Sequence, residues 1–152
     1  MTSLVFRILD RQVISGLADD IAVADARGSV SYAQLLHESA CIAAGLHHMG
    51  VEAGTSVVLD QLHGRDLVTS VLACARIGAV PAATADFRLT GVPPVLHAPT
   101  TEVTWDLLDK AGRTEPATAP EHDPDGYEEA VRAAYPDLVD TLERGGTIST
   151  SR

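Results

Sequence analysis

The stretch from Val30 to Pro81 limits the possible folds of this chain more than any other part of it. Ser31 and Gln34 have the spacing of a capping box, in which each side chain binds a backbone N–H of the first helical turn. The helical periodicity that follows ends at Gly50. One side of this predicted helix is expected to face the core, and it carries Leu35, Leu36, Ser39, Ile42, Ala43, Leu46 and Met49.

A second helix is predicted from about Asp66 to Ile77, and Gly78 ends it. Two short apolar runs, residues 57–59 and 79–82, suit strands that are buried on both faces. Strands that alternate with helices favour a parallel sheet. The predicted fold class is therefore α/β: a small three-layer domain with a mostly parallel sheet flanked by helices.

The outer side of the first predicted helix carries His37, Cys41 and His48. A His and a Cys four residues apart can bind zinc, so these three are weak candidates for a metal site, and a solvated or partner-facing surface is the simpler interpretation. Cys74 falls on the core side of the second helix. We therefore expect no metal and no disulfide, and we expect Cys41 but not Cys74 to react with thiol reagents.

Three ordered patterns in this stretch carry a family resemblance. The residues are Ser31, Tyr32 and Leu35, then Ala43, Leu46, Gly50, Val51, Gly54 and Val57, then Ala73, Gly78, Ala79, Val80 and Pro81. They resemble the start of the adenylate-forming superfamily, which includes AMP-binding acyl- and aryl-CoA synthetases, peptide-synthetase adenylation domains and luciferases. Its first subdomain reads T-Y-x-E-L, then A-x-x-L-x-x-x-G-V-x-x-G-D-x-V, then A-x-x-x-G-A-V-x-x-P. Residues 19–25 and 88–90 extend the resemblance in both directions.

The sequence divides into three parts. Residues 1–112 form the predicted α/β domain, and residues 113–126 hold three prolines among small and acidic residues, which is typical of a linker. Residues 127–144 form an amphipathic helical tail that Pro136 interrupts. Residues 101–106 alternate with Val103 and Trp105 on one side, which predicts a strand.

The resemblance also implies what this sequence would need for adenylation. In the superfamily a Ser/Thr/Gly-rich loop ending in P-K-G wraps the ATP phosphates, and a lysine acts from a mobile C-terminal domain. Residues 145–152 resemble that loop only weakly and lack its lysine. The only lysine of the chain is Lys110. No cofactor-binding residue is carried over, no cofactor is expected, and adenylation by this chain alone is not expected.

A strand-end crevice supplies weak candidates for catalysis. His63 and Asp66 follow one predicted strand, and Asp86 and Arg88 follow another. Ligands bind at such carboxyl ends in parallel sheets, and His63 with Asp66 could act as an acid–base pair. Helix capping by Asp66 and a surface ion pair of Asp86 with Arg88 are the simpler interpretations.

The net charge and the hydropathy pattern of the chain limit the kinds of partner that it could bind. The net charge is −10, with no basic stripe, which argues against nucleic acid and anionic membranes. No apolar run approaches the length of a membrane span, and Arg7, Asp10 and Arg11 interrupt any signal-peptide core. A cytoplasmic protein is expected.

Two classes of function follow from these observations. The first is an accessory or interaction protein that associates with itself, as a homodimer, or with a synthetase-type partner. The second is a small enzyme that reuses the crevice of His63, Asp66, Asp86 and Arg88 on a small organic acid or natural-product intermediate. A split acid-CoA ligase completed in trans by another chain is a further alternative.

Overall fold

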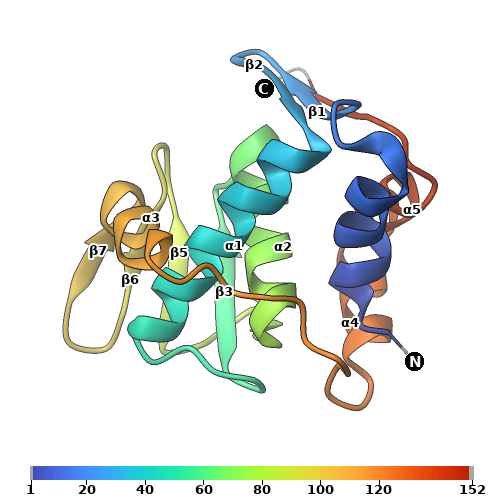
Figure 1. Cartoon of the computed structure of the whole chain (residues 1–152). Helices are drawn as coiled ribbons and strands as arrows, with labels where there is room; N and C mark the ends of the chain where they lie inside the picture. Colours follow the sequence, from blue (N-terminus) through green and yellow to red (C-terminus); the bar gives the residue numbers. More distant parts are fainter. Residues whose placement is uncertain (1, 151–152) are drawn as a thin grey trace.

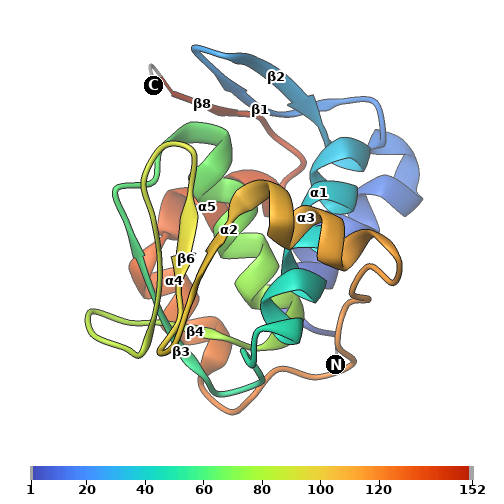
Figure 2. The ribbon, with the colours of Figure 1, turned by 90° about the vertical axis from the view of Figure 1, so that its left-hand side faces the viewer.

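Three layers make up the protein in the computed structural model, which describes residues 2–150. A sheet forms one side, α1 and α2 form the middle, and the N-terminal helical segment with α4 and α5 forms the other side (Figure 1). A quarter turn shows α3 beside α1 and the small β1–β2 hairpin above the helices (Figure 2). The sequence prediction of an α/β domain is confirmed.

The described elements run as follows, with η for the π-helical turns: η1 (Phe6–Asp10), η2 (Val13–Leu17), β1 (Ile21–Asp25), β2 (Gly28–Ser31), α1 (Tyr32–His48), β3 (Ser56–Asp60), α2 (Gly64–Ile77), β4 (Val80–Pro81), β5 (Phe87–Thr90), β6 (Val95–His97), β7 (Glu102–Thr104), α3 (Trp105–Arg113), α4 (Tyr127–Ala134), α5 (Pro136–Glu143) and β8 (Ile148–Ser149).

The larger sheet is mixed, whereas the sequence predicted a mostly parallel one. Its strand order is β4-β3-β5-β6-β7. The β4–β3 and β3–β5 pairs are parallel, and the β5–β6 and β6–β7 pairs are antiparallel. The two hairpins come from short turns after β5 and β6, which leave no room for a crossover helix. A second sheet has the order β2-β1-β8, with β8 parallel to β1.

Local sequence signals explain the helix starts. The Ser31 side chain accepts a hydrogen bond from the Gln34 N–H, and Gln34 returns one to the Ser31 backbone, so the predicted capping box is confirmed. The strand predicted over residues 101–106 is present as β7, Glu102–Thr104, but it ends before Trp105. The Thr104 hydroxyl accepts from the Leu107 N–H, and α3 therefore begins at Trp105.

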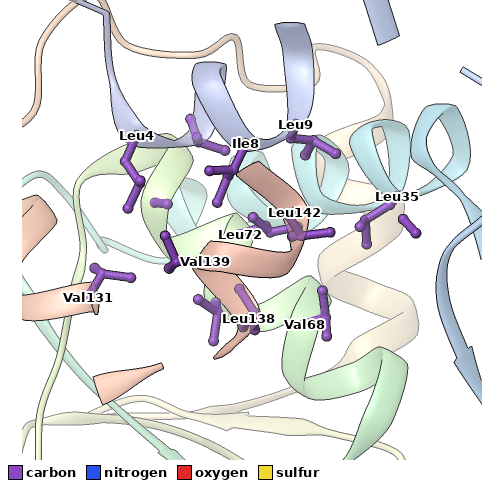
Figure 3. Packing of buried hydrophobic residues seen from close by; sticks show 14 of the residues in the cluster. Leu4, Ile8, Leu9, Leu35, Val68, Leu72, Val131, Leu138, Val139 and Leu142 are labelled. Atoms are coloured by element: carbon purple, nitrogen blue, oxygen red, sulfur yellow. The ribbon is translucent and has the colours of Figure 1, made fainter. Parts of the chain in front are cut away.

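Two apolar clusters lie on the two sides of the middle layer. The cluster toward the sheet includes Ile42, Leu46, Val57, Leu89, Leu96 and Leu108. The other cluster joins the middle layer to the N-terminal segment and to α4 and α5, as Figure 3 shows, and includes Leu4, Ile8, Leu9, Leu35, Val68, Leu72, Val131, Leu138, Val139 and Leu142. Helices α1 and α2 are therefore buried on two sides, which is why their sequences are so rich in apolar and small residues.

Helix α3 covers the side of α1 that the sequence assigned to solvent. Its Gly112 lies against the backbone of α1: a Cβ there would be 2.7 Å from the Cys41 carbonyl carbon and 3.0 Å from the Gly45 nitrogen. A Cβ on Gly45 would likewise be 2.8 Å from the Leu108 carbonyl carbon. Cys41 is completely buried beneath α3, so the prediction that it points outward is wrong.

The helices after residue 126 pack on their own chain. The Tyr127 hydroxyl donates a 2.7 Å hydrogen bond to the Ala79 carbonyl, and Val131, Val139 and Leu142 are buried in the cluster of Figure 3. Arg132 also binds Glu143 at 3.0 Å. The predicted amphipathic tail thus buries its apolar side within the chain.

Candidate functional site

A cleft of about 620 Å³ opens where the middle helices, α3 and the turn after β5 meet. The carboxyl ends of the parallel strands β3 and β5 point toward this edge of the sheet, because α2 and the turn at residues 91–94 follow them directly. Its lining residues are Arg27, Gln34, His37, Glu38, Arg65, Asp66, Pro93, Pro94, Trp105, Asp106, Asp109 and Arg113.

A carboxylate of this chain already binds the amino end of α2. The Asp25 Oδ2 accepts the Arg65 N–H at 2.9 Å, and its Oδ1 accepts the Arg27 N–H at 2.9 Å. The bond from Arg65, followed by those from Arg27, lowers the pKa of the Asp25 carboxyl despite its burial. Asp25 therefore occupies the position at the amino end of α2 where a ligand anion could otherwise bind.

The arginines of the cleft are paired within the chain. Arg27 binds Asp66 at 3.1 Å, and this bond raises the pKa of the Arg27 guanidinium. Arg65 donates from Nε to both carboxylate oxygens of Glu38, at 3.3 and 3.1 Å. Arg113 pairs with a carboxylate one helical turn before it, that of Asp109. Such fixed pairs leave little uncompensated positive charge for a polyphosphate.

The structure separates the residues predicted for the strand-end crevice. Asp66 lines the cleft, but it does not cap α2, whose N-cap residue is His63 without a side-chain hydrogen bond. His63 and Asp86 are exposed and do not line the cleft. Arg88 binds Asp60 at 3.1 Å, rather than Asp86, on an exposed part of the sheet. The four residues therefore form no common constellation.

The candidate metal ligands also separate. The His37 Nε2 lies 3.7 Å from the Cys41 sulfur, and His48 is exposed near the far end of α1. Burial, the largest cause, raises the pKa of the Cys41 thiol, which opposes the thiolate that a metal needs. Among residues 2–150, no group of three or more His, Cys, Asp or Glu side chains could hold a metal ion.

Sequence reasoning missed most residues of the cleft, among them Arg27 and Trp105, and it also missed Asp25, which binds the Arg65 amide. Asp25 and Arg27 lie in the β1–β2 hairpin, 40 residues before the Arg65 amide that Asp25 binds. Trp105 was assigned to a strand. The signal that could have found Asp25 is the D-x-R-G turn, in which an Asp side chain accepts the N–H two residues later, as Asp25 does from Arg27.

The sequence matches the AMP-binding enzyme family over residues 9–90. The chain belongs to this family. Relatives include acyl-CoA synthetase short-chain family member 3 from mouse mitochondria, which is 31% identical over 86 residues, and acetyl-coenzyme A synthetase from Deinococcus radiodurans, which is 39% identical over 84 residues. The aligned regions cover 53% and 52% of this chain but only 13% of either relative.

A solved structure shares the fold over nearly the entire chain. The fused adenylation–PCP di-domain NpsA-ThdA from Klebsiella oxytoca superposes on 98% of this chain with a TM-score of 0.73 and 14% identity. The matched part is 38% of that chain. The fold of this AMP-binding family member therefore matches part of an adenylation protein, and the superposition extends beyond the sequence match at residue 90.

The helices between residues 2 and 150 include none that combines the length and the apolar character of a membrane span.

Proposed function

We propose that this chain is an accessory or interaction protein built on the first part of the AMP-binding fold, and that it does not form an acyl or aryl adenylate alone. One observation carries the proposal: the amino end of α2 is bound by Asp25, and the arginines of the adjacent cleft are bound by Asp66, Glu38 and Asp109. A triphosphate entering this edge of the sheet would meet carboxylates where it needs donors.

Pyrophosphate exchange by the purified chain tests the proposal. The assay supplies Mg-ATP with acetate, longer fatty acids and benzoate in turn, and a full-length acyl-CoA synthetase serves as positive control. We expect no exchange above the rate without protein. Exchange that saturates with any acid and scales with protein concentration would overturn the non-catalytic assignment.

A second candidate is one part of a ligase that another chain completes. The superposition favours it, because 98% of this chain matches only 38% of the NpsA-ThdA chain. The test is exchange activity after mixing with an AMP-binding protein whose own first 150 or so residues have been removed. Activity restored by this chain, and absent from either component alone, would support completion in trans.

Self-association is a further form of the interaction role. The tail helices pack on their own chain, so a homodimer would have to use another surface, such as the edge strands β7 or β2. Sedimentation equilibrium at micromolar concentration distinguishes a dimer from a monomer. A monomer throughout that range would contradict self-association, and the partner would then have to be a different protein.

A further inference from the structure

The cleft has more negative charge than its ion pairs balance. Its lining holds four carboxylates, those of Glu38, Asp66, Asp106 and Asp109, against the three guanidiniums of Arg27, Arg65 and Arg113. Arg27, the partner of Asp66, also lies 3.7 Å from the Asp25 carboxylate. Asp106, at the start of α3, also lines the cleft and has no ion-pair partner within residues 2–150. The cleft can therefore receive another positive charge without meeting an unpaired cation.

Trp105, Pro93 and Pro94 form the apolar part of the cleft lining. Trp105 is half-buried and packs against the sheet-side apolar cluster, and its backbone N–H donates to the Pro94 carbonyl at 3.1 Å. The face of a tryptophan ring attracts cations, and a guanidinium stacks on it more favourably than an ammonium because it is planar and weakly hydrated. This apolar part of the lining therefore favours a planar organic cation over a metal ion.

Trp105 and Asp106 both line the cleft from the first turn of α3, and Asp109 lines it one turn later. A planar cation that stacks on Trp105 would come within reach of the Asp106 carboxylate, while the Asp109 carboxylate is partly shared with Arg113. This combination of an aromatic face and adjacent carboxylates is a common way to bind an arginine side chain.

We propose that this cleft docks an arginine side chain of a partner polypeptide. The assignment rests on the proposed interaction function, and it specifies the chemistry of the partner: a segment with at least one exposed arginine in basic or neutral surroundings. The net charge of −10 would steer such a segment toward this chain.

Fluorescence of Trp105 measures the docking directly, because it is the only tryptophan of the chain. The probes are acetyl-Gly-Arg-Gly-amide and the same peptide with citrulline, which has nearly the same shape without the charge. We expect a saturable fluorescence change with the arginine peptide and a change at least fivefold weaker in affinity with the citrulline peptide. Equal affinities would overturn the proposal. Methylguanidinium that binds as tightly as the peptide would overturn the assignment to a polypeptide.

Two substitutions locate the peptide. Asp106→Asn should weaken the arginine peptide about two- to fivefold, the range for an exposed ion pair. Asp86→Asn removes the same charge from an exposed position outside the cleft and should change the affinity by much less. Equal effects of the two variants would show attraction by net charge only, and would overturn the site. Far-UV circular dichroism of both variants confirms that they are folded.

The peptide titration and the exchange assay test two separate proposals, and either proposal can be overturned without the other. Exchange activity would overturn the non-catalytic function whatever the peptide does. Absence of exchange together with equal binding of both peptides would overturn only the arginine site.

Discussion

Helix α3 and the C-terminal helices cover opposite sides of the same middle layer, but they do so by different means. Helix α3 contacts α1 through backbone at Gly45 and Gly112. On the other side, large side chains such as Leu9, Leu142 and Val139 fill the space, and arginine–carboxylate pairs surround them. The contact of α3 with α1 leaves no space for an added atom. The packing of the C-terminal helices is instead stabilised by buried apolar area and by ion pairs. The two sides should therefore respond to different perturbations.

The largest effect is expected from Gly112→Ala. The new methyl group would overlap the Cys41 carbonyl, so α3 must move away from α1, and we expect a loss of more than about 3 kcal/mol of unfolding free energy. Urea denaturation measures the loss. The thiol of Cys41 should also become reactive in the folded variant.

The exposed neighbour Ala111 supplies the matched control. Ala111→Ser adds one atom on the solvent side of α3 and should change stability by less than about 0.5 kcal/mol. A Gly112→Ala variant as stable as this control would show that the close contact of α3 with α1 is not formed.

Asp10→Ala tests the other side of the layer. Arg76 on α2 is 4% exposed and binds Asp10 through two hydrogen bonds of 2.7 and 3.0 Å, and it also donates to the Ala117 carbonyl. Removing Asp10 leaves a buried guanidinium without its counter-charge, which costs about 3 kcal/mol. Arg76→Met in the same background should recover part of the loss, because the buried charge is then gone. A stable Asp10→Ala single variant would contradict the pairing.

A smaller effect is expected from Arg132→Ala. Arg132 binds Glu128, Asp140 and Glu143, and the hydrogen bonds from Arg7 and Arg132 lower the pKa of Glu128 against the opposing effect of burial. These groups are partly exposed, so we expect a loss of about 1 kcal/mol at low salt that shrinks as salt is added. A loss that does not change with salt would indicate a packing defect instead.

The smallest effect concerns pH and Asp25. Its pKa is lowered in the folded protein, so its contribution is present above the unfolded pKa of about 3.9 and is lost as the pH falls through the folded value. The stability difference between the natural chain and Asp25→Asn should therefore narrow below about pH 4. Urea denaturation between pH 3 and 6 measures it. A difference that stays constant across this range would contradict the bond to the α2 amino end.

The sequence predicted those features that local patterns encode. The capping box of Ser31 and Gln34 and the glycine ends of the two middle-layer helices were visible within short stretches of sequence. Family membership also followed from ordered local motifs within residues 9–90.

Features that depend on distant residues were missed. The burial of Cys41 requires a helix that begins more than 60 residues later, and helical periodicity of α1 alone cannot reveal it. The bond from Asp25 to the amino end of α2 and the charge pairing of the cleft likewise join separate elements. Of the candidate residues chosen by position after a strand, Asp66 therefore lines the cleft, whereas His63 and Asp86 do not.

Calorimetric titration of the intact chain with Mg-ATP shows whether a nucleotide can bind at this edge of the sheet. Under the proposed function, Asp25 and the paired arginines leave no free donors there for a nucleotide phosphate. We therefore expect no saturable heat at millimolar ATP, for the natural chain and for Asp86→Asn alike. One-to-one binding with a measurable dissociation constant by the natural chain would contradict this expectation.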